Sequence, residues 1–144
     1  MSWNLIARVT TVACCLGFGL FVVANDEATK DPTLRELQSM KLDLLEDIAE
    51  RYRFGFSLGK PVLEELLAAE HQVLLAKLDL TDSQTDRIKL REEVVKNRSD
   101  LVDARIAGMR LGKNAEVDML TARVMLIDAQ IDLANARSQG GHTR

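Results

Sequence analysis

Residues 55–80 read GFSLGKPVLEELLAAEHQVLLAKLDL, and residues 108–133 read GMRLGKNAEVDMLTARVMLIDAQIDL. At an offset of 53 residues, the two stretches share nine identities in 26 aligned positions, several times what composition alone would give. Each copy is a glycine-containing turn followed by apolar residues at heptad spacing, which is typical of a repeated helical hairpin. The sequence therefore predicts an all-α fold built from a duplicated helix–turn–helix unit.

No segment shows the alternation of a strand, so we expect helices only. The apolar pattern and the two glycine turns predict an elongated domain of three long antiparallel helices. The first helix starts at a capping box formed by Thr33 and Glu36 and ends near Gly55 or Leu58. The second covers 61–110 and the third runs from about 115 to 137.

The helix over 61–110 is expected to be continuous, because neither glycine nor proline occurs between Pro61 and Gly108. Its length would be about 75 Å at 1.5 Å per residue, which would place the two glycine turns at opposite ends of a rod. The alternative is a break near 82–86, where Thr, Asp and Ser gather, and it would give a four-helix bundle.

The N-terminal segment over 1–24 has the features of a secretory signal peptide, with an apolar run after Arg8 and Val-Val-Ala at its end. A retained N-terminal anchor and a lipoprotein are the alternatives. Both cysteines, Cys14 and Cys15, lie in this segment, so the remaining chain offers no disulfide. We expect a polar linker over 25–32, the hairpin domain over 33–138, a flexible tail over 139–144, and a periplasmic or envelope location.

The composition excludes several classes of function. The formal net charge is −3, with acidic and basic residues interspersed, which argues against binding to nucleic acid or to anionic lipid. No nucleophile–base set, phosphate loop or metal-ligand spacing is present, and His71 and His142 are the only histidines. We therefore expect a protein that is not an enzyme and binds no cofactor or metal, with membrane contact only through a possible N-terminal anchor.

Two features point to a protein partner. Tyr52, Phe54 and Phe56 cluster just before the first turn, either as a plug at the end of the bundle or as an exposed contact. The third helix carries two apolar seams, which is more than one neighbour can cover. The first seam is Val117, Leu120, Val124, Ile127, Ile131 and Ala134, and the second is Met119, Ala122, Leu126, Ala129, Leu133 and Ala136. This predicts self-association or docking onto another envelope coiled coil.

The second repeat reads Gly112, five residues, then Asp118-Met119-Leu120-x-Ala122, with Leu and Ala continuing at heptad spacing. This pattern resembles the periplasmic helical-hairpin repeat of TolC-type outer-membrane efflux proteins, and the resemblance covers that repeat only. It implies a scaffold or adaptor-contacting role in efflux, with the partner meeting the turn regions. The candidate contact residues are Tyr52, Phe54, Phe56, Gly59, Gly112, Asp118, Met119 and Leu120.

A second resemblance concerns Leu80-Thr81-Asp82-Ser83-Gln84, which matches the Leu-Thr-x-x-Gln signature of Spy/CpxP-type periplasmic proteins. In that family the threonine caps a helix and the glutamine supports the turn, which would favour a break near 82–86. This resemblance implies a periplasmic chaperone or stress sensor, and it is the alternative function.

Overall fold

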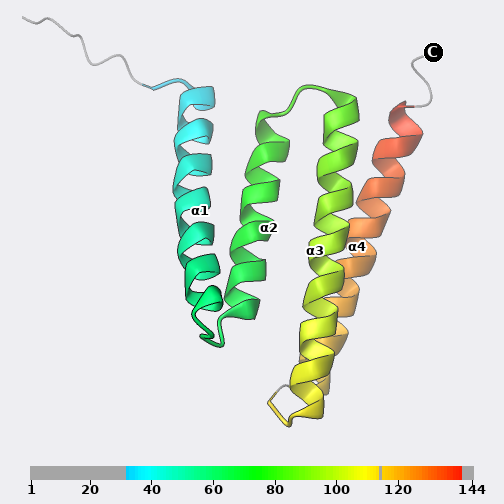
Figure 1. Cartoon of the computed structure of the whole chain (residues 1–144). Helices are drawn as coiled ribbons and strands as arrows, with labels where there is room; N and C mark the ends of the chain where they lie inside the picture. Colours follow the sequence, from blue (N-terminus) through cyan, green and yellow to red (C-terminus); the bar gives the residue numbers. More distant parts are fainter. Residues whose placement is uncertain (1–31, 114, 141–144) are drawn as a thin grey trace, which may run out of the picture. The chain divides into compact units, whose positions relative to one another are not determined.

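The computed structural model describes residues 32–113 and 115–140, which form four helices and contain no strand. The helices are α1 (Leu34–Ser57), α2 (Leu63–Leu80), α3 (Gln84–Arg110) and α4 (Glu116–Gly140). They run alternately up and down (Figure 1). The all-α fold is confirmed for these residues, with four helices rather than three. The expected signal peptide over 1–24 lies outside them.

Each helix packs on the next one along the chain. The contacts are α1 with α2, α2 with α3, and α3 with α4, and no Cα atoms of non-consecutive described helices approach within 8 Å. The two central helices therefore have two neighbours each, whereas α1 and α4 have one described neighbour each and form the edges of the row (Figure 1).

The expectation of a continuous helix over 61–110 is wrong, because α2 ends at Leu80 and α3 begins at Gln84; the alternative of four helices fits, with the break at 81–83. Ser83 has extended backbone angles, and its side chain accepts a hydrogen bond from the Asp86 N–H at 3.3 Å, so it caps α3. A serine cap ends one helix and starts another without glycine or proline, because its hydroxyl satisfies a backbone donor that a continuous helix would satisfy itself.

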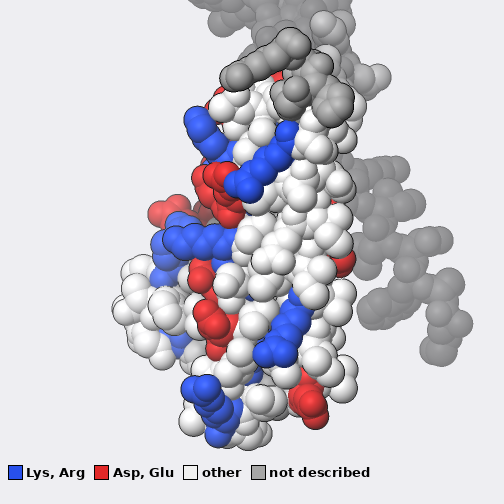
Figure 2. All heavy atoms as spheres, turned by 90° about the vertical axis from the view of Figure 1, so that its right-hand side faces the viewer, with Lys and Arg blue, Asp and Glu red and all other residues white. Residues whose placement is uncertain are grey.

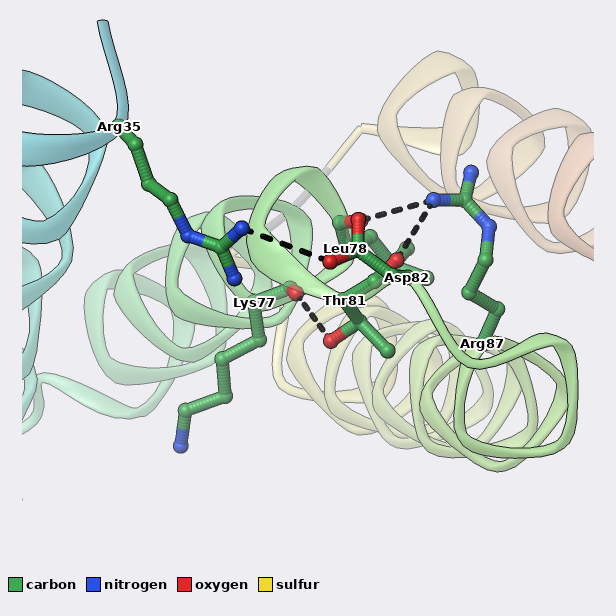
Figure 3. Close-up of polar contacts among 6 residues, drawn as sticks. All are labelled: Arg35, Lys77, Leu78, Thr81, Asp82 and Arg87. Carbon is green, nitrogen blue, oxygen red and sulfur yellow. Dashed lines mark hydrogen bonds and ion pairs between the residues drawn. The ribbon is translucent and has the colours of Figure 1, made fainter. Parts of the chain in front are cut away.

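The end of α2 is held by side chains, as Figure 3 shows. Thr81 Oγ1 donates to the Lys77 carbonyl at 2.6 Å, and Arg87 Nη1 donates to the carbonyls of Leu78 and Thr81, both at 3.1 Å. Arg35 forms an ion pair with Asp82 at 3.5 Å, which ties the start of α1 to this connection. The hydrogen bonds from Thr81 and Arg87 supply partners to backbone carbonyls that the end of a helix leaves unsatisfied.

The two glycine turns have the same backbone structure. Gly59 and Gly112 have positive φ angles of 77° and 68°, and the N–H groups of Lys60 and Lys113 donate to carbonyls five residues earlier. This is the Schellman arrangement that ends many helices. Since the chain reverses at 81–83, both turns lie at the same end of the helices, not at opposite ends as a continuous helix would require (Figure 1).

The helix contacts are built largely from small side chains. Ala49, Ala69 and Val73 are buried between α1 and α2, with Leu42, Leu45 and Tyr52 packed against them. In α4 the second of the two expected seams faces the contact: Leu126 is half-buried, and the other five members are buried, namely Met119, Ala122, Ala129, Leu133 and Ala136. Alanine at these positions lets helix backbones approach closely. The helix α4 continues to Gly140, beyond the expected end at Arg137, and residues 141–144 of the expected tail lie outside the described residues.

Replacing Gly112 with alanine should lower the free energy of unfolding by about 1 kcal/mol, because a Cβ disfavours its positive φ angle even though no atom lies within 4 Å of the added carbon. Gly55→Ala is the matched control. Gly55 is helical and its added Cβ would meet its neighbours at ordinary distances of 3.6 and 3.7 Å, so this change should be neutral or stabilising. Urea unfolding of both variants checks the difference in sign.

Candidate functional site

The three aromatic residues before the first turn do not act as one cluster. Tyr52 is partly buried and packs against the α1–α2 core, whereas Phe54 and Phe56 are exposed. Phe54 is two positions from Tyr52 and points in a different direction, whereas Phe56 is on the same side as Tyr52 but lies in the last turn of α1. Tyr52 therefore serves packing at the end of α1, and Phe54 and Phe56 remain available to a partner beside the Gly59 turn.

The candidate residues after the second turn are also divided between structural and exposed positions. Asp118 accepts a hydrogen bond from the Ala115 N–H at 3.1 Å and lies 3.7 Å from Arg105, so its carboxylate supports the start of α4. Met119 is buried. Leu120 is exposed and begins to define a larger apolar surface, while Gly112 contributes through its backbone angle.

The first seam of α4 is exposed along its length. We call its five large members the α4 stripe; they are between 48% and 69% exposed and comprise Val117, Leu120, Val124, Ile127 and Ile131. Figure 2 views the molecule from the side on which α4 lies and shows a largely uncharged band with acidic and basic groups beside it. Large aliphatic side chains aligned on one helix face indicate a contact surface.

A second exposed stripe lies on α1, at the other edge of the row. The α1 stripe consists of residues between 44% and 73% exposed, namely Leu34, Leu37, Met40, Leu44 and Ile48. The sequence contained these leucines at helical spacing, but the pattern alone did not indicate which face of α1 would meet α2. The α1 stripe was therefore absent from the candidate residues.

The polar residues of the row serve mainly to join its helices. Arg53 pairs with Glu70 at 2.8 Å and Lys77 pairs with Glu46 at 2.9 Å, both across the α1–α2 contact. These residues line a groove of about 790 Å³ over α1, α2 and α3 that has more acidic than basic side chains. Among the described residues, no group of three or more His, Cys, Asp or Glu is placed to hold a metal ion, and no helix is long and apolar enough to cross a membrane.

His71 lies on α2, and its Nδ1 is buried without a hydrogen-bond partner. Burial, with a smaller contribution from the positive charge of Arg98, lowers the pKa of His71 to about 4. In the folded protein this imidazole is therefore neutral at physiological pH, and it packs within the row of helices.

The lowered pKa predicts a loss of stability in acid. The unfolded chain takes up a proton on His71 near pH 6.5 and the folded protein only near pH 4, so the contribution is present above pH 6.5 and lost as the pH falls between these values. Because the ring is partly accessible, we expect a loss of about 1–2 kcal/mol relative to His71→Gln. Urea unfolding of both proteins between pH 7 and pH 4 measures the difference, and parallel pH profiles would contradict the expectation.

Comparison of the chain with protein-family models, with curated proteins and with solved structures finds no match. The functional argument therefore depends on the residues and geometry described above.

Proposed function

We propose that this chain is a non-catalytic protein-binding module of the cell envelope, which binds helical partners through the edges of its row of helices. The observation that carries the proposal is the pair of exposed apolar stripes on α1 and α4. Apolar surface of this extent costs free energy in water and is stabilised when a second helix covers it. The N-terminal sequence supports an envelope location.

The resemblance of the repeat to TolC-type periplasmic hairpins supports a scaffold or adaptor-contacting role. Both glycine turns lie at the same end of the helices, so a single partner could meet both of them (Figure 1). The exposed Phe54 and Phe56 lie at that end, next to the Gly59 turn.

A photo-crosslinking amino acid placed at Val124 or at Phe56 in living cells tests this role. We expect crosslinks to an envelope protein with coiled-coil helices, such as the adaptor of an efflux pump. The same amino acid at the exposed Gln130 of α4, off the stripe, is the control and should give few crosslinks. Equal crosslinking at the two α4 positions would contradict a binding role for the stripe.

The location is tested by mass spectrometry of the mature N-terminus. A start at Asn25 in the periplasmic fraction would support a cleaved signal, and an intact N-terminus in the membrane fraction would support an anchor. A full-length chain in the cytosol would contradict the envelope proposal.

A Spy/CpxP-like chaperone or stress sensor is the second candidate, because the Leu-Thr-x-x-Gln segment coincides with the α2–α3 connection. Gln84 Nε2 donates to the Ala136 carbonyl at 2.7 Å and so joins the start of α3 to the end of α4. An aggregation assay with an unfolded client separates the two candidates. Suppression at near-stoichiometric ratios would favour the chaperone, and no suppression, together with specific crosslinks at Val124, would favour the module.

A further inference from the structure

We propose that a second copy of this chain packs its α1 stripe against the α4 stripe of the first, in the arrangement that α3 adopts on α2 within one chain. The proposal rests on the binding role of the two stripes and names their occupant. It follows from the internal repeat: a shift of 53 residues maps the residues of the α2–α3 contact onto the exposed stripes of α4 and α1.

The repeat is structural as well as sequential. The helices α1 and α3 end at Ser57 and Arg110, and α2 and α4 begin at Leu63 and Glu116, so both boundaries recur at the sequence offset of 53. The turn bonds recur at the same offset: Lys60 donates to the Gly55 carbonyl at 3.2 Å, and Lys113 to the Gly108 carbonyl at 2.9 Å. Hence α1 corresponds to α3, and α2 corresponds to α4.

Among the described helices, α2 is covered on two faces by α1 and α3, whereas α4 is covered on one face by α3. On the first face of α2, Ala69 and Val73 pack against α1. The equivalent of Ala69 on α4 is Ala122, which is buried in the α3–α4 contact. On the second face of α2, Leu67 is buried and its carbonyl accepts a hydrogen bond of 3.0 Å from Asn97 of α3. At an offset of 53, the residues of this second face become the α4 stripe: Leu67, His71, Leu74 and Leu78 correspond to Leu120, Val124, Ile127 and Ile131.

The face of α3 that covers α2 corresponds in turn to the α1 stripe. Arg87 donates to Leu78 of α2, Asn97 donates to Leu67, and Leu90 lines a pocket together with the last turn of α2. Their equivalents on α1 are Leu34, Leu44 and Leu37, all of which are exposed. The two edges of the row therefore present the two halves of a contact that the chain already makes at its centre.

The central contact fixes the register of the proposed one. Since Asn97 meets Leu67 and Arg87 meets Leu78, Leu44 of the second copy would meet Leu120, and Leu34 would meet Ile131, with the two helices antiparallel. Two polar side chains of the central contact, Arg87 and Asn97, are leucines in the proposed one. The contact between copies is therefore more apolar than the contact within a chain.

The ten stripe residues would supply most of the surface of such a contact. With about half of each side chain exposed, they offer on the order of 900 Å² of apolar surface, and flanking side chains would have to contribute the rest of the roughly 1,200–2,000 Å² that stable interfaces bury. Because the two stripes differ, the contact is head-to-tail, and repeated copies form a closed ring or an open filament.

Sedimentation of the chain purified from the cell envelope tests this arrangement with two double variants, V124E/I131E on α4 and L37E/L44E on α1. The wild-type chain should form assemblies larger than a dimer at about 100 µM, and each variant alone should be a monomer. An equimolar mixture of the two variants should form a 1:1 dimer, because each supplies the stripe that the other lacks.

The outcomes distinguish this arrangement from others. Met125→Glu, on α4 beside the stripe, is the matched control and should assemble as the wild type does, and circular dichroism of every variant should retain the wild-type helicity. A monomeric wild-type chain would overturn the proposal but leave the stripes open to another protein, so the proposed function would survive. A dimer of the α1 variant alone, with no mixed dimer of the two variants in the mixture, would indicate an α4–α4 contact and would also overturn it.

Discussion

Leu67→Ala should lower the free energy of unfolding by about 2–4 kcal/mol, the range for deleting most of a buried leucine side chain. Leu67 is 6% exposed, and its carbonyl accepts the hydrogen bond from the buried Asn97, so it lies in the contact between the two hairpins. The change leaves a cavity in the contact between α2 and α3. Urea unfolding followed by circular dichroism measures the effect.

The repeat supplies the control for this prediction. Leu120 occupies the equivalent position on α4 but is 48% exposed, so Leu120→Ala should cost less than about 1 kcal/mol in dilute, monomeric protein. The difference arises from burial alone, because the residue type and the position in the repeat are the same. Equal losses in the two variants would show that α4 is covered within the monomer, contrary to the structure.

Ala122→Asp should unfold the α3–α4 hairpin, at a cost of more than about 4 kcal/mol, because it places a carboxylate in the buried contact between two helices. Ala122 is 2% exposed in the α3–α4 contact. Circular dichroism should show a loss of helical signal at 25 °C, and a thermal scan should show a broad transition at lower temperature.

The matched control is Ala134→Asp, which places the same side chain on an exposed position of the same helix. It should lower the unfolding free energy by no more than about 1 kcal/mol, the size of the difference in helix propensity between Ala and Asp. A comparable loss of helix in both variants would mean that helix propensity, not burial, accounts for the effect of Ala122→Asp.

Local signals predicted much of this fold. The capping box of Thr33 and Glu36 marked the start of α1, where both of its hydrogen bonds are present. The pairs Gly59–Lys60 and Gly112–Lys113 marked the two turns, because a positive φ angle at the end of a helix favours glycine. These features depend on a few neighbouring residues and can therefore be read from the sequence.

The sequence left two features open. The residues near 82–86 pointed to a break only as the alternative, and the break is held by Arg87, which bonds to carbonyls six and nine residues earlier, and by Gln84, which bonds to Ala136 far along the chain. Of the two seams on α4, the sequence could not say which one meets α3. Tyr52, Met119 and Asp118 were chosen as contact residues for their position near the turns, but burial and helix capping occupy them.

The order of the helix contacts has a consequence for how the chain folds. Each described helix packs only on the helices next to it in the sequence, so most native contacts join residues close in sequence. Topologies of this kind fold in microseconds to milliseconds. The α2–α3 contact is the smallest of the three, so the two hairpins are expected to behave as separate cooperative units in native-state hydrogen exchange. The chain would then open at its middle before either hairpin melts, as a repeat array does when it loses one unit at a time.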